Sequence, residues 1–213
     1  MQFTFSKQQL KSSFLVRKTS QYFLMCLPQF HVPMTIIYTH EDGSKDIFLR
    51  KEELGHGGFA VVYRVTHQTT GKDYAMKVLS KEKYEGPKGK KSLEKLKNEI
   101  LIQKSLNHPN IVRSYYAFTD AFNYYIVLEY CPGKTVRDLL KNSENGYLSE
   151  PETRKILRDV IRGLVYLHDN HIIHRDLKLE NYMIGSDGKV KIADFGLSVI
   201  LKNEDDKRYS ICG

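Results

Sequence analysis

The sequence HRDLKLEN occupies residues 174–181, and the triplet DFG follows at residues 194–196. Within these stretches, Asp176 offers a carboxylate that can accept a proton from a hydroxyl group, and Asn181 and Asp194 offer oxygen atoms of the kind that bind Mg²⁺. Phosphoryl transfer from ATP requires such a base, a metal ion held by oxygen ligands and a cation on the phosphates. The two stretches therefore predict the base and the metal ligands of a phosphoryl-transfer site.

A cation that could complete this set lies upstream, in the sequence YAMK at residues 74–77. Lys77 ends an alternating pattern that predicts a strand, and Glu99 lies in the helical pattern that follows. An isolated lysine on a strand is usually a surface residue. Here a glycine-rich loop precedes Lys77, and Glu99 could pair with it and fix its flexible side chain. We therefore expect the Lys77 ammonium to reach the phosphates of a nucleotide.

The glycine-rich loop is the sequence LGHGGFAVV at residues 54–62. Glycines allow backbone amides to approach phosphate oxygens closely. A dinucleotide-binding fingerprint has a similar glycine pattern, but it must open a helix and be followed by an acidic residue about 20 positions later. Residues 61–65 continue as a strand, and Met76–Lys77 stands where the acid should be, so this alternative is rejected. The triplet GKT at residues 133–135 is not a Walker A loop, because Leu128 replaces the required glycine.

Hydrophobic periodicity places these motifs on a simple framework. It predicts strands at about 47–54, 59–66, 72–79, 115–119 and 124–130, and a helix from about Ser92 to Leu106. A longer helix begins after Ser149, which with Glu152 forms a capping-box pattern. The order indicates an α+β protein in which a small β-rich lobe lies beside a helical lobe, with a ligand crevice between them.

These motifs together resemble the eukaryotic protein kinase superfamily, serine/threonine type, over residues 47–213. Within it the chain is most similar to polo-like kinases, through GHGGFA at 55–60, LSEPE at 148–152 and KRYSICG at 207–213. Aurora and calcium/calmodulin-type kinases are the alternatives. The resemblance implies a bilobal protein-kinase-like fold with a five-stranded antiparallel N-lobe containing one helix. It divides the chain into a basic, disordered leader (1–46), the N-lobe (47–130) and a partial helical C-lobe that ends in the activation segment (131–213).

The resemblance also implies roles for individual residues. Lys178 would steady the transferred phosphoryl group, and His174 would be a packed scaffold residue. Ser210 is the implied phosphorylation site. The catalytic set is Asp176, Lys178, Lys77 and Glu99, and the metal set is Asn181 and Asp194. The nucleotide would contact Leu54, Gly55, His56, Gly57, Gly58, Phe59, Ala60, Val62, Ala75, Lys77, Leu128, Glu129, Cys131 and Met183.

Composition and charge limit the classes of partner and the cellular compartment that we expect for this chain. The net charge of +8, from 33 basic and 25 acidic residues, favours phosphate-bearing ligands in general. The lysine-rich segment 81–91 has a single aromatic residue, Tyr84, and no recognised nucleic-acid motif, so we expect a solvated loop and no nucleic-acid partner. The three cysteines have no metal-ligand spacing, which favours a reducing compartment. Residues 14–27 are semi-apolar but include Arg17 and Lys18, which argues against a secretory signal. We expect no membrane partner and a cytoplasmic location, nuclear or centrosomal if the chain is polo-like.

The expected function is ATP-dependent phosphorylation of protein serine or threonine hydroxyls, with ATP and Mg²⁺ as cofactors. The alternative is a non-catalytic kinase-like binding module, either a pseudokinase or a truncated isoform. A kinase should continue beyond Gly213 through further C-lobe helices. The chain given should therefore expose the apolar face of the helix after Ser149, aggregate readily and show little activity alone.

Overall fold

The structure is a computed structural model that describes residues 32–57, 60–85 and 90–201. Three predicted site residues, Gly58, Phe59 and Ser210, lie outside the described residues. The same is true of the activation-segment motif at 207–213 and of most of the expected leader.

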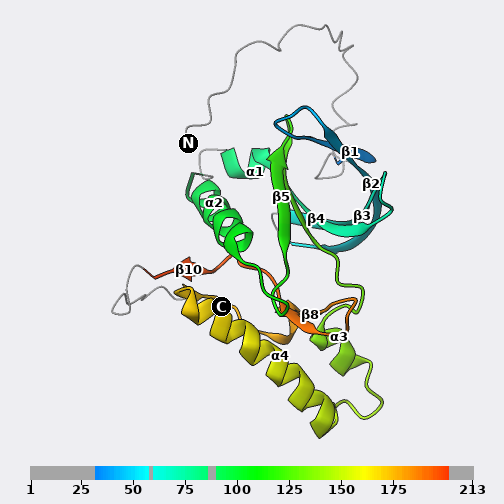
Figure 1. Cartoon of the computed structure of the whole chain (residues 1–213), viewed down its shortest axis with the longest axis vertical. Coiled ribbons are helices and arrows are strands. Elements are labelled where there is room, and N and C mark those ends of the chain that lie inside the picture. The colour runs from blue at the N-terminus through cyan, green and yellow to red at the C-terminus, as the bar shows by residue number, and fades with distance from the viewer. Residues whose placement is uncertain (1–31, 58–59, 86–89, 202–213) are drawn as a thin grey trace, which may run out of the picture. The chain divides into compact units, whose positions relative to one another are not determined.

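One antiparallel sheet dominates the first part of the described chain (Figure 1). Its order is β1-β2-β3-β4-β6-β5. The turn between β1 and β2 contains Gly43, and the turn between β3 and β4 contains Gly71, both at positive φ, which glycine adopts without strain. The strands are β1 (Thr35–Thr39), β2 (Lys45–His56), β3 (Ala60–His67), β4 (Asp73–Ser80), β5 (Ser114–Thr119) and β6 (Asn123–Glu129).

The five predicted strands are present as β2 to β6, and the sheet has a sixth strand that was not predicted. The extra strand, β1, pairs with β2 from Thr35↔Leu49 to Thr39↔Lys45. Part of the segment expected to be a disordered leader is therefore ordered strand. The sheet curls enough for Tyr38 on β1 to contact Tyr116 and Phe118 on β5, at the opposite edge, with 5.1 Å between ring centroids in both cases. These aromatic contacts stabilise the association of β1 with the sheet.

Four helices and several short strands complete the described chain. Helix α1 (Lys81–Glu85) occupies part of the segment expected to be loop, and α2 (Lys90–Ser105) is the predicted helix carrying Glu99. Helix α4 (Glu150–Asp169) begins with the predicted capping box, in which Ser149 and Glu152 exchange hydrogen bonds. The remaining elements are α3 (Val136–Lys141), β7 (Ile172–Ile173), the 3₁₀ helix η2 (Leu179–Asn181), β8 (Tyr182–Ile184), β9 (Val190–Ile192) and β10 (Val199–Ile200).

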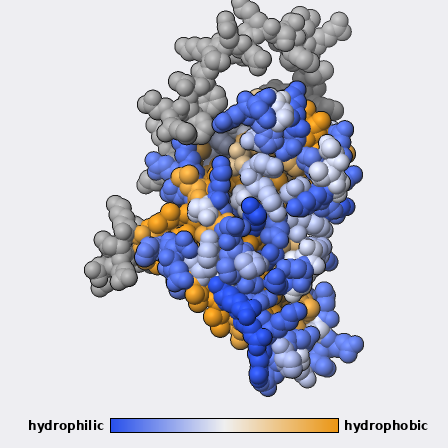
Figure 2. Space-filling model, viewed as in Figure 1, coloured by the Kyte–Doolittle hydropathy of each residue, from blue (hydrophilic) through white to orange (hydrophobic). Residues whose placement is uncertain are grey.

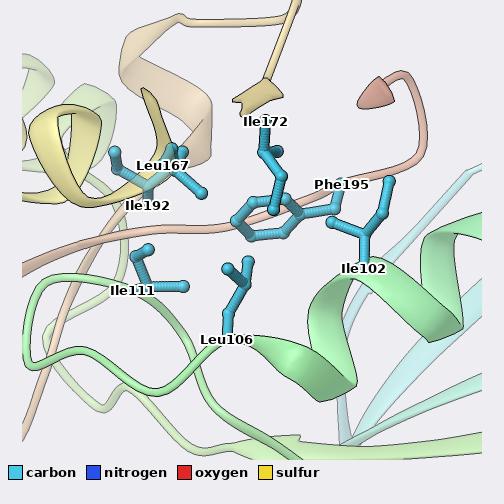
Figure 3. Packing of buried hydrophobic residues seen from close by; sticks show 7 residues of the cluster. All are labelled: Ile102, Leu106, Ile111, Leu167, Ile172, Ile192 and Phe195. Atoms are coloured by element: carbon cyan, nitrogen blue, oxygen red, sulfur yellow. The ribbon is translucent and has the colours of Figure 1, made fainter. Parts of the chain in front are cut away.

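A hydrophobic cluster joins α2 to the elements that follow the sheet (Figure 3). Phe195 is fully buried, and its ring lies among side chains of α2 and β7. The ring also makes an edge contact with His174, at 5.0 Å between centroids. The cluster therefore ties the segment around residue 195 to α2, the helix that carries Glu99. Its members are Ile102, Leu106, Ile111, Leu167, Ile172, Ile192 and Phe195.

One face of α4 is apolar and exposed. Leu157, Ile161 and Val165 follow one another at four-residue steps and are 53%, 56% and 53% exposed. Figure 2 shows hydrophobic surface along this helix. The predicted exposure of this face is confirmed for the chain given. Among the described residues, no helix is both long and apolar enough to cross a membrane.

Candidate functional site

The predicted lysine–glutamate pair is present. Lys77 lies on β4 and Glu99 on α2, and the lysine Nζ donates to Glu99 Oε1 at 2.6 Å. The same ammonium lies 3.6 Å from Asp194 Oδ1. Burial disfavours the charged lysine, but the Glu99 and Asp194 carboxylates outweigh burial, and the pKa of Lys77 is raised. The lysine is therefore a fixed cation placed between two carboxylates.

The predicted base lies in a compact network with two other predicted residues. Lys178 Nζ donates to Asp176 Oδ2 at 2.7 Å. Asn181 Nδ2 donates to the Asp176 backbone oxygen at 2.8 Å and to Oδ2 at 2.9 Å. The hydrogen bond from Lys178, followed by that from Asn181, lowers the pKa of Asp176, so this carboxylate is ionised at neutral pH. Because the Asn181 nitrogen faces Asp176, its amide oxygen is the atom that could bind a cation.

His174 connects the segment around Asp176 to the segment around Asp194. Its Nδ1 accepts a hydrogen bond from the Asp176 backbone N–H at 3.2 Å, so Nε2 carries the proton donated to the Ala193 carbonyl at 2.9 Å. Burial lowers the pKa of His174, which keeps the ring neutral. The predicted scaffold role agrees with this geometry.

Two residues at the site have strained backbones. Arg175 has φ 68° and Asp194 has φ 60°, in the left-handed region that non-glycine residues seldom adopt. Such conformations cost about 1–3 kcal/mol each and persist where surrounding contacts hold them. The Arg175 guanidinium supplies one such contact, because its Nε donates to the Leu197 carbonyl at 2.7 Å. The left-handed backbone at these two residues turns the chain next to the charged groups of the site.

A cleft of about 330 Å³ is lined by three of these residues. Glu99, Asp176 and Asp194 line it, so residues separated by up to 95 positions share one cavity. Sequence reasoning missed several lining residues. Lys95 is four residues before Glu99, a spacing that places it on the same helix face and could have revealed it. The lining residues that we did not predict are Tyr84, Lys95, Leu96, Gly196 and Leu197.

Strand register brings the predicted nucleotide contacts together on the sheet. Val62 pairs with Gly55 on one side and with Lys77 on the other. Ala75 pairs with Leu128. Residues paired across adjacent strands share a face of the sheet, and so do residues two apart on one strand. All five residues therefore lie on the face that carries the Lys77 ammonium.

The remaining predicted contacts lie at the ends of the β2–β3 turn, at or just after the end of β6, and on β8. His56 is exposed on the β2 end of the glycine-rich loop and hydrogen-bonds Glu53 at 2.8 Å. Cys131 is buried just after β6, and burial raises the pKa of its thiol to about 12. Met183 lies on β8 and bridges to Thr135. Leu54, Gly57 and Ala60 lie at the two ends of the β2–β3 turn, and Glu129 ends β6.

Residues 48–213 match the protein kinase domain family. The chain therefore belongs to the protein kinase family. Among its relatives, it is 39% identical to the serine/threonine-protein kinase PLK2 of Mus musculus over 166 residues, which are 78% of this chain and 24% of the mouse protein. It is 41% identical to the cell cycle serine/threonine-protein kinase CDC5/MSD2 of Saccharomyces cerevisiae over 75% of this chain and 22% of that protein. It is 40% identical to the serine/threonine-protein kinase polo of Drosophila melanogaster over 78% of this chain and 28% of that protein.

These relatives confirm the resemblance to serine/threonine kinases of the polo-like group. The chain spans about a quarter of the length of the curated relatives that it matches.

Proposed function

We propose that this chain is the nucleotide-binding and catalytic part of a protein serine/threonine kinase that transfers the γ-phosphate of Mg-ATP to a protein hydroxyl. One observation carries the proposal. The Lys77 ammonium lies 2.6 Å from Glu99 and 3.6 Å from Asp194, and both of these carboxylates line a cleft that Asp176 also lines. A fixed cation, metal-binding oxygens and an ionised carboxylate are the groups that phosphoryl transfer requires.

Each charged group has a role in this proposal. Lys77 binds the α- and β-phosphates, and Glu99 fixes its position. Asp176 accepts a hydrogen bond from the acceptor hydroxyl and takes its proton, because its lowered pKa keeps it ionised. Lys178, which also contacts Asp176, lies where it can steady the transferred phosphoryl group.

The donor set fits a magnesium ion. Asn181 and Asp194 would hold it through an amide oxygen and a carboxylate, the hard oxygen ligands that Mg²⁺ prefers. When bound, the metal would neutralise negative charge on the phosphate oxygens.

The sheet face around Val62 and Ala75 provides the adenine pocket, with Leu54 above and Met183 below. Glu129 and Cys131 supply backbone hydrogen bonds to the adenine, and Leu128 lies at the back of the pocket. Gly55, His56, Gly57 and Ala60, at the two ends of the glycine-rich loop, contact the phosphates. Ser210 remains the proposed phosphorylation site.

Mg-ATP binding and phosphoryl transfer test the proposal separately. We expect the 213-residue chain to bind Mg-ATP in isothermal titration calorimetry, and Asp194→Asn to weaken that binding. Asp176→Asn should leave binding nearly unchanged and lower the weak transfer expected of this chain alone, to a dephosphorylated casein acceptor, by about 10²–10⁴-fold. Lys189→Met, an exposed substitution outside the cleft, is the control. Binding without any transfer would favour the non-catalytic module, and absence of Mg-ATP binding would refute the proposal.

A further inference from the structure

Lys191 is a buried cation that the proposed chemistry does not use. Its side chain is 7% exposed and lies on β9, remote in sequence from its partners. Its Nζ lies 3.0 Å from Glu129 Oε1 and donates to the Pro109 carbonyl at 2.8 Å. One ammonium group therefore connects β9, the loop after α2 and the end of β6.

The strand that carries Lys191 is firmly anchored. The Val190 N–H donates to Asp159 Oδ2 on α4 at 3.0 Å, and Asn110 Nδ2 donates to the Val190 carbonyl at 2.9 Å. On the other side of Lys191, the Ile192 N–H donates to the Asn110 carbonyl at 2.9 Å. Because its neighbours on both sides are held, Lys191 extends from a fixed base.

The space for the lysine side chain is also built into the fold. A Cβ atom at Gly185 would lie 2.8 Å from Lys191 Cε, so the lysine side chain packs closely over this glycine. A second close contact lies nearby, since a Cβ at Gly133 would lie 2.6 Å from Ile184 Cβ. The Gly133 N–H also donates to the Ile184 carbonyl at 3.0 Å. The hinge, which we define as residues 129–133, thus contacts the β8–β9 hairpin at both of its ends.

We propose that Lys191 is a positioning residue that fixes the hinge through the Glu129 carboxylate and thereby strengthens nucleotide binding. This inference rests on the proposed function, in which Glu129 and Cys131 contact adenine through their backbone. The Glu129 side chain cannot move away from the buried ammonium without leaving that charge poorly compensated, so the backbone of Glu129 is held with it. A site that is already ordered loses less conformational entropy when a ligand binds.

The test compares two lysines of the same hairpin. Lys191→Met keeps the length of the side chain and removes the charge. Lys189→Met is the matched control, because Lys189 lies two residues before Lys191 and its ion pair with Asp187 is exposed. We expect Lys191→Met to weaken Mg-ATP binding about three- to tenfold and to increase hydrogen exchange of the hinge amides without nucleotide. We expect Lys189→Met to change neither.

Binding is compared at a temperature where circular dichroism shows each variant to be folded, because a purely structural role would lower stability and leave the affinity of the folded chain unchanged. If Lys191→Met does not fold, Glu129→Gln carries the test, with a smaller loss of affinity of about two- to threefold. Unchanged hinge exchange and affinity would overturn the inference. An unsubstituted chain that fails to bind Mg-ATP would refute the proposed function and the nucleotide part of the inference. Hinge exchange would still decide whether Lys191 fixes the hinge.

Discussion

Replacing Glu99 by glutamine tests how much the central ion pair stabilises the fold. The substitution keeps the shape of the side chain and removes its charge. The pair is short, at 2.6 Å, and Glu99 is only 8% exposed. A hydrogen bond between charged groups contributes about 1.5–3 kcal/mol. Because Asp194 lies 3.6 Å from the same ammonium and can compensate in part, we expect a loss of about 1–2 kcal/mol in the free energy of unfolding.

Urea unfolding followed by circular dichroism measures this loss. Glu94→Gln, an exposed substitution on the same helix, is the control and should change stability by less than about 0.5 kcal/mol. In an Asp194→Asn background, Glu99→Gln should cost more, about 3–5 kcal/mol, because Lys77 then has no carboxylate within reach in the described cleft. Equal stability of Glu99→Gln and Glu94→Gln, or no increase in the Asp194→Asn background, would refute the assignment of Lys77 as a cation shared by two carboxylates.

Three further predictions concern stability and association. Leu167→Ala should lower the free energy of unfolding by about 2–5 kcal/mol, since this side chain is fully buried, whereas Val165→Ala, more than half exposed, should cost less than about 1 kcal/mol in the same urea experiment. Burial lowers the pKa of His174 from its ordinary value of 6.5, so the unfolded chain binds more protons than the folded chain. Thermal melts should therefore show stability falling as the pH drops below about 6.5, and this fall should be less steep in His174→Gln. Ile161→Lys should reduce self-association in analytical ultracentrifugation, because it places a charge in the exposed apolar face of α4; unchanged association would show that another surface is responsible.

Local sequence signals predicted much of the sheet and the long helix. The turn at Gly71 and the capping box of Ser149 depend on residues within a few positions of one another. Strand β1 depends on distant contacts, because Tyr38 meets Tyr116 and Phe118 only once the sheet has curled. A short strand in a basic segment gives little local signal of its own. Helix α3 was also missed, although Thr135 and Asp138 form a capping box there, because its six residues carry too short a pattern.

The candidate site likewise contains residues that local motifs predicted and residues whose role depends on distant contacts. The motif residues Lys77, Asp176 and Asp194 lie in short, characteristic sequences. The structure pairs Lys77 with Asp194 and places Asp176 and Asp194 in the lining of one cleft. Tyr84 lines that cleft from α1, in a segment that the sequence indicated as a solvated loop. The importance of Lys191 depends on its burial against Glu129 and Pro109, neither of which is near it in sequence.

Strand β1 has a practical consequence for where this kinase region can be cut. The match to the protein kinase domain starts at residue 48, after β1 and three residues into β2. A chain trimmed to that match would lose both β1 and the start of β2, and Phe48, Leu49 and Arg50 would lose their partners Ile36, Thr35 and Met34. An open edge of this kind can recruit a strand from another molecule. Expression that begins near residue 32 would keep β1 paired with β2 and Tyr38 in contact with Tyr116 and Phe118, and should give the better-behaved sample.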